Sequence, residues 1–190
     1  MNLLAHIFLS GDDHEVLIGN FIGDHVKGNR KFDYPDAIRR GIELHRAIDH
    51  FTDTHPITAQ SRKYLYERHS KYSGVVLDLF YDHFLAANFN DFSPVPLEKF
   101  TREKYALLDQ SQHWFPEKVK HFYPFMVERD WLTNYATIEG IGRTLTGLSR
   151  RVSFENRMHE ATVDLVQFYE PLEKDFKLFF PELIHFSSSY

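Results

Sequence analysis

Acidic and imidazole side chains stand four residues apart inside strongly apolar segments, and this feature constrains the fold most. Asp78 and Asp82 lie in GVVLDLFYDHF, and His45 and Asp49 lie in GIELHRAIDHFTD. Residues at positions i and i+4 share one face of an α-helix. A buried carboxylate without a partner is costly, so these groups need a metal ion, a cationic side chain or backbone N–H groups. The spacing therefore predicts helices that aim acidic and imidazole groups at a common partner.

The hydrophobic pattern is helical nearly throughout, and no segment shows sustained alternation. The 190 residues suit one domain with a sizeable core, and no linker, repeat or low-complexity tract divides them. We therefore predict an all-α, single-domain helical bundle over residues 1–190, with loops at KGNRKFDYP and FNDFSPVP. The predicted helices span about 2–9, 12–26, 35–55, 58–71, 74–87, 96–110, 116–130, 134–148 and 154–180.

Charge and composition narrow the class of protein. The net charge is −5 at pH 7, which argues against general affinity for nucleic acid. Cysteine is absent, which removes a thiol nucleophile, a cysteine zinc site and any disulfide, and fits a cytoplasmic protein. No apolar run approaches the roughly 20 residues of a membrane span, so we expect no membrane partner. The oligomeric state is left open.

The paired positions favour a metal site. Oxygen-rich sites with some imidazole suit Mn²⁺, Mg²⁺, Fe or Zn²⁺. Asp24 follows a glycine in another apolar segment, GNFIGDHVKG. The candidate metal ligands are Asp24, His45, Asp78 and Asp82. The alternative is a salt-bridge network in which Arg39, Arg40 or Arg46 neutralises the carboxylates and fastens the helices together.

His6, in MNLLAHIFLS, is a weaker candidate, because a single histidine on an apolar face is more often a hydrogen-bonded core residue.

Signatures of other enzyme classes are missing. The chain has no Walker A loop, dinucleotide-binding fingerprint, G-x-S-x-G elbow or H-E-x-x-H pair. The Glu-x-x-His pairs of ferritin-like di-iron proteins are also absent.

Four segments together resemble the acyl carrier protein phosphodiesterase family: NLLAHIFLS, GNFIGDHVKG, GIELHRAIDHFTDTHP and GVVLDLFYDHFLA. The resemblance is distinctive over residues 2–90 and looser beyond them. It implies an all-helical, metal-dependent relative of the HD phosphohydrolases that removes the 4′-phosphopantetheine arm from holo acyl carrier protein, usually with Mn²⁺. The dipeptide His-Asp never occurs here, whereas Asp-His occurs four times. The usual HD ligand assignment therefore does not transfer.

The implied reaction suggests catalytic roles for Asp24, Asp49 and His83. Asp24 would hold the metal, with Mn²⁺ expected and Mg²⁺ or another divalent ion as the alternative. Asp49 or His83 would orient water or protonate the serine oxygen that leaves.

The implied partner is acidic, as is this chain, so docking requires a local basic surface. We select Lys27, Arg30 and Arg40, which flank the proposed site in the sequence.

Two other functions stay open. An HD-like phosphohydrolase of nucleotides or alarmones would use the same metal chemistry, and a non-catalytic helical binding protein would satisfy the acidic and imidazole groups internally.

Overall fold

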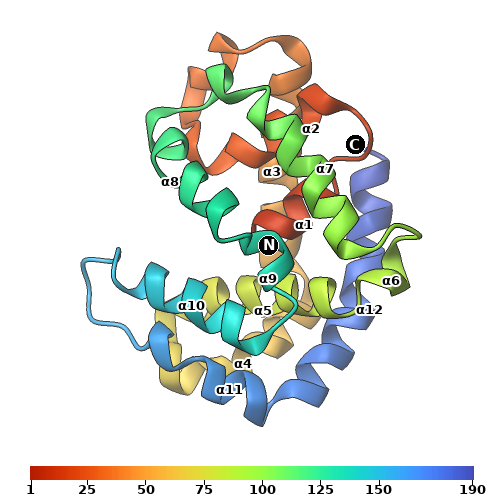
Figure 1. Ribbon diagram of the computed structural model, residues 1–190. Helices are drawn as coiled ribbons and strands as arrows, with labels where there is room; N and C mark the ends of the chain where they lie inside the picture. Colours follow the sequence, from red (N-terminus) through yellow and green to blue (C-terminus); the bar gives the residue numbers. More distant parts are fainter.

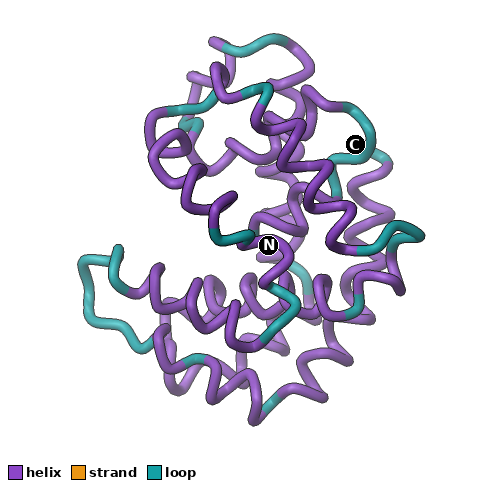
Figure 2. Tube along the Cα trace, in the orientation of Figure 1, coloured by secondary structure: helices purple, strands orange, loops and turns teal.

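Every regular element is helical in the computed structural model, which describes residues 1–190. Twelve α-helices are joined by short loops and 3₁₀ turns, and no strand is present (Figure 1, Figure 2), so the all-α prediction is confirmed. No helix has the length and apolar character needed to cross a membrane. The helices are α1 Leu3–Phe8, α2 His14–Ile22, α3 Asp36–Thr54, α4 Pro56–His69, α5 Ser73–Ala87, α6 Phe89–Phe92, α7 Leu97–Asp109, α8 Glu117–Glu128, α9 Trp131–Asn134, α10 Ile138–Ser149, α11 Thr162–Gln167 and α12 Tyr169–Ser188.

The first half of the chain follows the predicted helices closely. Asp13 caps α2, because its carboxylate accepts hydrogen bonds from the N–H groups of Glu15 and Val16. Pro35 directly precedes α3, as its fixed backbone angle favours. The second helix is shorter than predicted, because the chain tightens into a 3₁₀ turn at Gly23–His25.

Two later predictions were wrong. The segment FNDFSPVP was expected to be a loop, but its first four residues form α6, anchored by the buried ring of Phe89. The single helix predicted over 154–180 is two helices, α11 and α12, and α12 continues to Ser188. The buried Asp164 of α11 pairs with Arg68 and His69 of α4, and this distant pairing fixes α11 separately.

The helices enclose one continuous cluster of 43 buried hydrophobic residues. In Figure 1, α1 lies near the centre of the molecule, where it packs against α2 and α5. The long helix α12 runs along one side and contacts α3, α4 and α5. The N-terminal segment is therefore an internal element of the core.

A buried carboxylate fastens α1 to α5. The fully buried Asp82 accepts hydrogen bonds from the backbone N–H groups of Asn2, Leu4 and Ala5, at 3.3, 2.8 and 3.2 Å. The first N–H groups of a helix lack partners within it, and its positive end stabilises a carboxylate. Burial raises the pKa of Asp82 to about 7, although the three N–H groups act against the rise. Asp82 thus holds the start of α1 in place.

Helices α2 and α3 approach each other to backbone contact. A Cβ atom at Gly19 would lie 1.9 Å from the Ile38 carbonyl oxygen, and one at Gly41 would lie 2.1 Å from the Val16 carbonyl oxygen. Larger residues would force the helices apart. This contact brings the middle of α2 against the middle of α3, where the candidate site begins.

We expect Gly41→Ala to lower the free energy of unfolding by about 1–3 kcal/mol, because its methyl group would overlap backbone of α2. The matched control is Gly147→Ala in α10, where an added Cβ meets nothing within 4 Å. The control should leave stability unchanged or raise it by up to about 1 kcal/mol. Urea denaturation followed by circular dichroism measures the free energy of unfolding of both variants. Equal values for the two variants would contradict the close contact between α2 and α3.

Candidate metal centre

Two buried imidazoles meet between α1 and α3. The rings of His6 and His45 stack with their centroids 3.9 Å apart and an angle of 17° between their planes. Gly23 makes room for this arrangement, because a Cβ there would lie 2.4 Å from Cγ of His45. The pair can approach so closely only if at least one ring is neutral.

Asp49 bridges the two rings, and Asp24 adds a second carboxylate. Asp49 Oδ1 lies 3.1 Å from His6 Nε2, and Asp49 Oδ2 lies 3.3 Å from His45 Nε2. Asp24 Oδ1 lies 3.2 Å from His45 Nε2. His6, His45 and Asp49 offer three ligand atoms within 4.8 Å of one another. We call these three residues the metal group, with Asp24 at its edge.

Asn20 of α2 orients both imidazoles through their Nδ1 atoms. His6 Nδ1–H donates to the side-chain oxygen of Asn20 at 2.8 Å, and His45 Nδ1–H donates to its backbone oxygen at 2.7 Å. The Asn20 amide nitrogen donates to the His6 carbonyl and to Ser10 Oγ, which fixes the amide so that its oxygen accepts. Each Nε2 is therefore left as the ligand atom, the usual arrangement for histidines that bind metal.

The two histidines have opposite pKa shifts. Burial lowers the pKa of His6 to about 4, so this ring is neutral at pH 7. Burial also acts against charge on His45, but Asp24 and Asp49 outweigh it and raise its pKa to about 9. Burial tends to raise the pKa of Asp49, yet the two histidines hold it well below its usual range. Protonated His45 therefore balances the carboxylates, and a divalent ion bound here would replace its proton.

The donor set fits a divalent metal. Neutral His6, with its proton on Nδ1, points the Nε2 lone pair at Asp49 Oδ1, 3.1 Å away, an arrangement that a cation between them would stabilise. His45 Nε2 is buried and has no well-aligned hydrogen bond. Imidazole nitrogen with carboxylate oxygen is a ligand set that Mn²⁺, Fe and Zn²⁺ accept.

The predicted ligands on α5 lie apart from the imidazoles. Asp78 Oδ1 lies 3.1 Å from the Met1 amino group, which is itself 3.6 Å from Asp49 Oδ1, and burial raises the pKa of Asp78. The Asp82 oxygens face the backbone of α1 and not the rings of His6 and His45. Of the four ligands predicted from the sequence, only Asp24 and His45 come into direct contact.

The predicted catalytic residues are also divided. Asp24 and Asp49 lie together at His45, as described above. His83 is buried elsewhere: its Nδ1 lies 2.8 Å from the Tyr135 carbonyl oxygen, and its Nε2 lies 3.1 Å from the Tyr169 hydroxyl. Both nitrogens thus have structural partners, and no hydrogen bond or ion pair connects His83 to the metal group.

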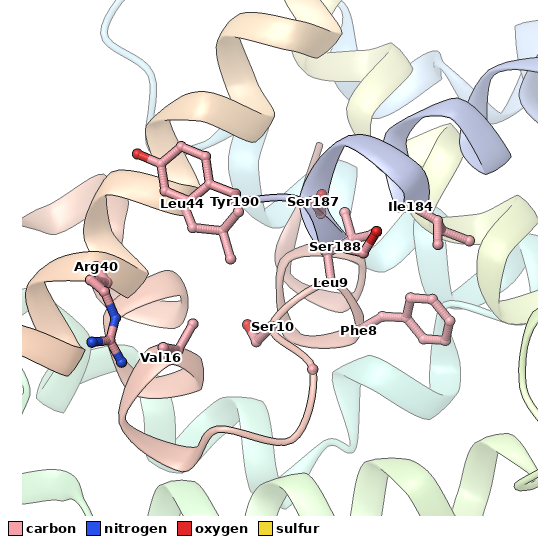
Figure 3. Close-up of a pocket in the computed structure, with 11 residues that line it drawn as sticks. Phe8, Leu9, Ser10, Val16, Arg40, Leu44, Ile184, Ser187, Ser188 and Tyr190 are labelled. Atoms are coloured by element: carbon pink, nitrogen blue, oxygen red, sulfur yellow. The ribbon is translucent and has the colours of Figure 1, made fainter.

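The predicted basic residues occupy two places. Lys27 and Arg30 are exposed on the turn that follows Asp24. Arg40 lies 3.4 Å from Asp13 and lines a cavity of about 370 Å³ between the end of α1 and the end of α12. Figure 3 shows this cavity, with Arg40 on one side and Ser188 on the other. It contains no member of the metal group.

The candidate site also contains His6, a weaker candidate from the sequence, and Asn20, which the sequence did not single out. The available signal for both was a polar residue inside an apolar segment, in NLLAHIFLS and in IGNFIG. Such residues are more often hydrogen-bonded core positions, and only the approach of α1, α2 and α3 shows that they share one site.

We expect Asn20→Ala to weaken metal binding about 10–100-fold, because the His6 ring would lose the acceptor that fixes its tautomer. Asn88→Ala is the control, since Asn88 also uses its side-chain amide, on Phe84 and Glu173 away from the metal group. Calorimetric titration with Mn²⁺ measures both affinities, and circular dichroism checks folding. Equal affinities would show that Asn20 does not orient the ligands.

Metal binding at pH 7 should release about one proton, from His45, because His6 is already neutral. Affinity should therefore fall about tenfold per pH unit as the pH drops below about 9. Calorimetry in buffers of different ionisation enthalpy counts the protons. Release of none would contradict the protonated state of His45.

Comparison with known proteins identifies the family of this chain. A family model described as acyl carrier protein phosphodiesterase matches residues 1–183. A protein of that name from Photorhabdus laumondii is 30% identical over 185 residues, which cover 97% of this chain and 93% of that protein. A protein of the same name from Pectobacterium atrosepticum is 30% identical over 190 residues, covering 100% and 98%. No solved structure matches the chain. The match extends from the start of α1 into α12, and this chain belongs to the acyl carrier protein phosphodiesterase family.

Proposed function

We propose that this protein hydrolyses holo acyl carrier protein, releasing 4′-phosphopantetheine from the carrier serine and leaving the apo form. The observation that carries the proposal is the metal group in a chain whose relatives are named acyl carrier protein phosphodiesterases. A non-catalytic helical protein would satisfy its buried ligands internally. The family membership favours the enzyme instead.

In this proposal, His6, His45 and Asp49 hold the metal, with Mn²⁺ as our choice and Mg²⁺ or another divalent ion as the alternative. When bound, the ion lowers the pKa of water and offsets the negative charge that develops on the phosphate. Asn20 keeps both Nε2 atoms free for it. Asp82 contributes indirectly, because it fixes α1 and thereby His6.

Asp24 is the residue best placed to act on the attacking water. Its side chain is 74% exposed, whereas that of Asp49 is 36% exposed and bridges the two imidazoles. His45 lowers the pKa of Asp24, so its carboxylate is ionised and accepts hydrogen bonds at neutral pH. Asp24 thus orients the water for attack on phosphorus.

The exposed Lys27 and Arg30 follow Asp24 directly, and we propose that they contact the acidic carrier protein. Added salt should then weaken association. Arg40, at a cavity without metal ligands, is a weaker candidate for this contact. The cytoplasmic location expected from the sequence stays a prediction.

Mass spectrometry of holo acyl carrier protein, incubated with this protein with and without Mn²⁺, tests the reaction. We expect metal-dependent loss of the phosphopantetheine mass and appearance of the apo carrier. An unchanged carrier in the presence of folded, metal-loaded protein would contradict the proposal. The same preparation would then be tested on nucleotides.

We expect His45→Ala to lower the metal-dependent rate by more than about a hundredfold, beyond the loss typical for residues that only support a ligand. His50→Ala is the matched control, because His50 is an exposed histidine on the same helix, next to Asp49. The control should keep the wild-type rate and metal content. Retained Mn²⁺ and activity in a folded His45→Ala variant would remove His45 from the site.

A further inference from the structure

A second cavity, of about 330 Å³, opens directly beside the metal group. Asp24 connects the two, since its Oδ1 lies 3.2 Å from His45 Nε2 and its side chain lines the cavity. One wall comes from the start of the chain, at Asn2 and Leu3, and the opposite wall comes from α8 to α10. Figure 1 shows α9 beside the N-terminus, with α10 extending away from it. A molecule in this cavity would reach the metal group at its Asp24 end.

The cavity is strongly cationic. Arg129, Arg143 and Arg151 line it, and Asp24 is its one acidic residue. The Arg143 guanidinium is already held by Glu139 and Asn134. Arg129 and Arg151 lie in no ion pair, and the Arg151 guanidinium carbon is 5.9 Å from the centroid of the Trp131 ring. An unpaired guanidinium held over an aromatic ring is well suited to bind a phosphate.

A buried hydroxyl group lies in the cavity wall. Tyr135 is only 1% exposed, its hydroxyl oxygen has no well-aligned hydrogen bond, and Thr144 is the side chain that interacts with it. Such a group is costly unless a ligand or water satisfies it. The wall also carries the amide of Asn134 and the hydroxyl of Thr144, next to the apolar Trp131 and Leu148. This mixture suits a chain that alternates amide and hydrocarbon groups.

Gly147 keeps the cavity open. It lies inside α10, where glycine disfavours the helix, and a Cβ at this position would meet nothing within 4 Å. No neighbouring residue therefore requires glycine here. The space that a ligand needs explains the presence of glycine at this position. A larger side chain here would fill the cavity without a clash in the core.

We propose that this cavity binds the 4′-phosphopantetheine arm of the substrate, with the phosphate beside Asp24 and Arg151 and the amide chain along Trp131 and Gly147. The inference rests on the proposed function and extends it, because it separates the wall that holds the arm from the residues that hold the metal. The arm offers one anionic phosphate, a hydroxyl group and two amides. The cavity offers unpaired guanidinium groups, hydroxyl side chains and apolar surface for them.

Filling the cavity is the first test. Gly147→Leu should lower kcat/KM on holo acyl carrier protein with Mn²⁺ by at least about tenfold, and weaken binding of free 4′-phosphopantetheine by a similar factor. Arg150→Leu places the same side chain at the exposed end of α10, outside the cavity, and should remain close to wild type. Calorimetry gives the Kd, and circular dichroism confirms that both variants fold.

Removing one guanidinium is the second test. Arg151→Ala should raise the Kd for 4′-phosphopantetheine about tenfold or more, through loss of a charged hydrogen bond, while the Kd for pantetheine, which lacks the phosphate, changes little. Arg150→Ala is the matched control, because Arg150 is exposed and does not line the cavity. Equal losses for both ligands would contradict the placement of the phosphate at Arg151.

The two proposals fail separately. If the wild-type protein releases phosphopantetheine and folded Gly147→Leu does so with unchanged kcat/KM, the cavity assignment is overturned and the proposed function stands. If the wild-type protein releases no phosphopantetheine, the proposed function fails. The binding measurement then tests the cavity assignment by itself. Binding of free 4′-phosphopantetheine that Gly147→Leu abolishes would then support the assignment. Unchanged or absent binding would overturn it.

Discussion

The structure depends on one buried carboxylate, that of Asp82, inside the apolar helix α5. Its oxygens accept the N–H groups that begin α1, so the cost of burying a charge is offset by three hydrogen bonds and by the positive end of a helix. A helix of six residues is not stable alone in water. Docking on Asp82 makes α1 part of the core, and His6 can serve in a site only because α1 is held there.

A second constraint, glycine contact between α2 and α3, sets the other half of the site. Gly19 and Gly41 allow backbone to touch backbone, and Asn20 follows Gly19 directly. Asn20 then accepts from the Nδ1 atoms of both histidines, with its side chain and with its carbonyl. Packing and ring orientation are therefore coupled, because the contact that closes the core also positions Asn20 against both imidazoles.

Charge is distributed so that the metal group and a cationic cavity lie side by side. The metal group places a neutral and a protonated imidazole against two carboxylates, a balance that a divalent ion can take over. Across Asp24 the surroundings change to unpaired arginines and aromatic rings. The metal group comes from the first third of the chain, and most of the facing wall comes from residues 122–151. The two parts meet only because α9 and α10 fold back against the N-terminal segment.

The sequence by itself determined the helical class, most helix positions and the pairing of His45 with Asp49, because periodicity and i,i+4 spacing are properties of one helix. It also carried the resemblance that the family match bears out.

Tertiary structure decided the rest. Asp78 and Asp82 share a helix stripe, yet one faces the Met1 amino group and the other caps α1, about 80 residues away in sequence. His6 reaches Asn20 and Asp49 across 14 and 43 residues. Local spacing shows which residues share a face, but packing between distant helices chooses the partner that satisfies each buried polar group.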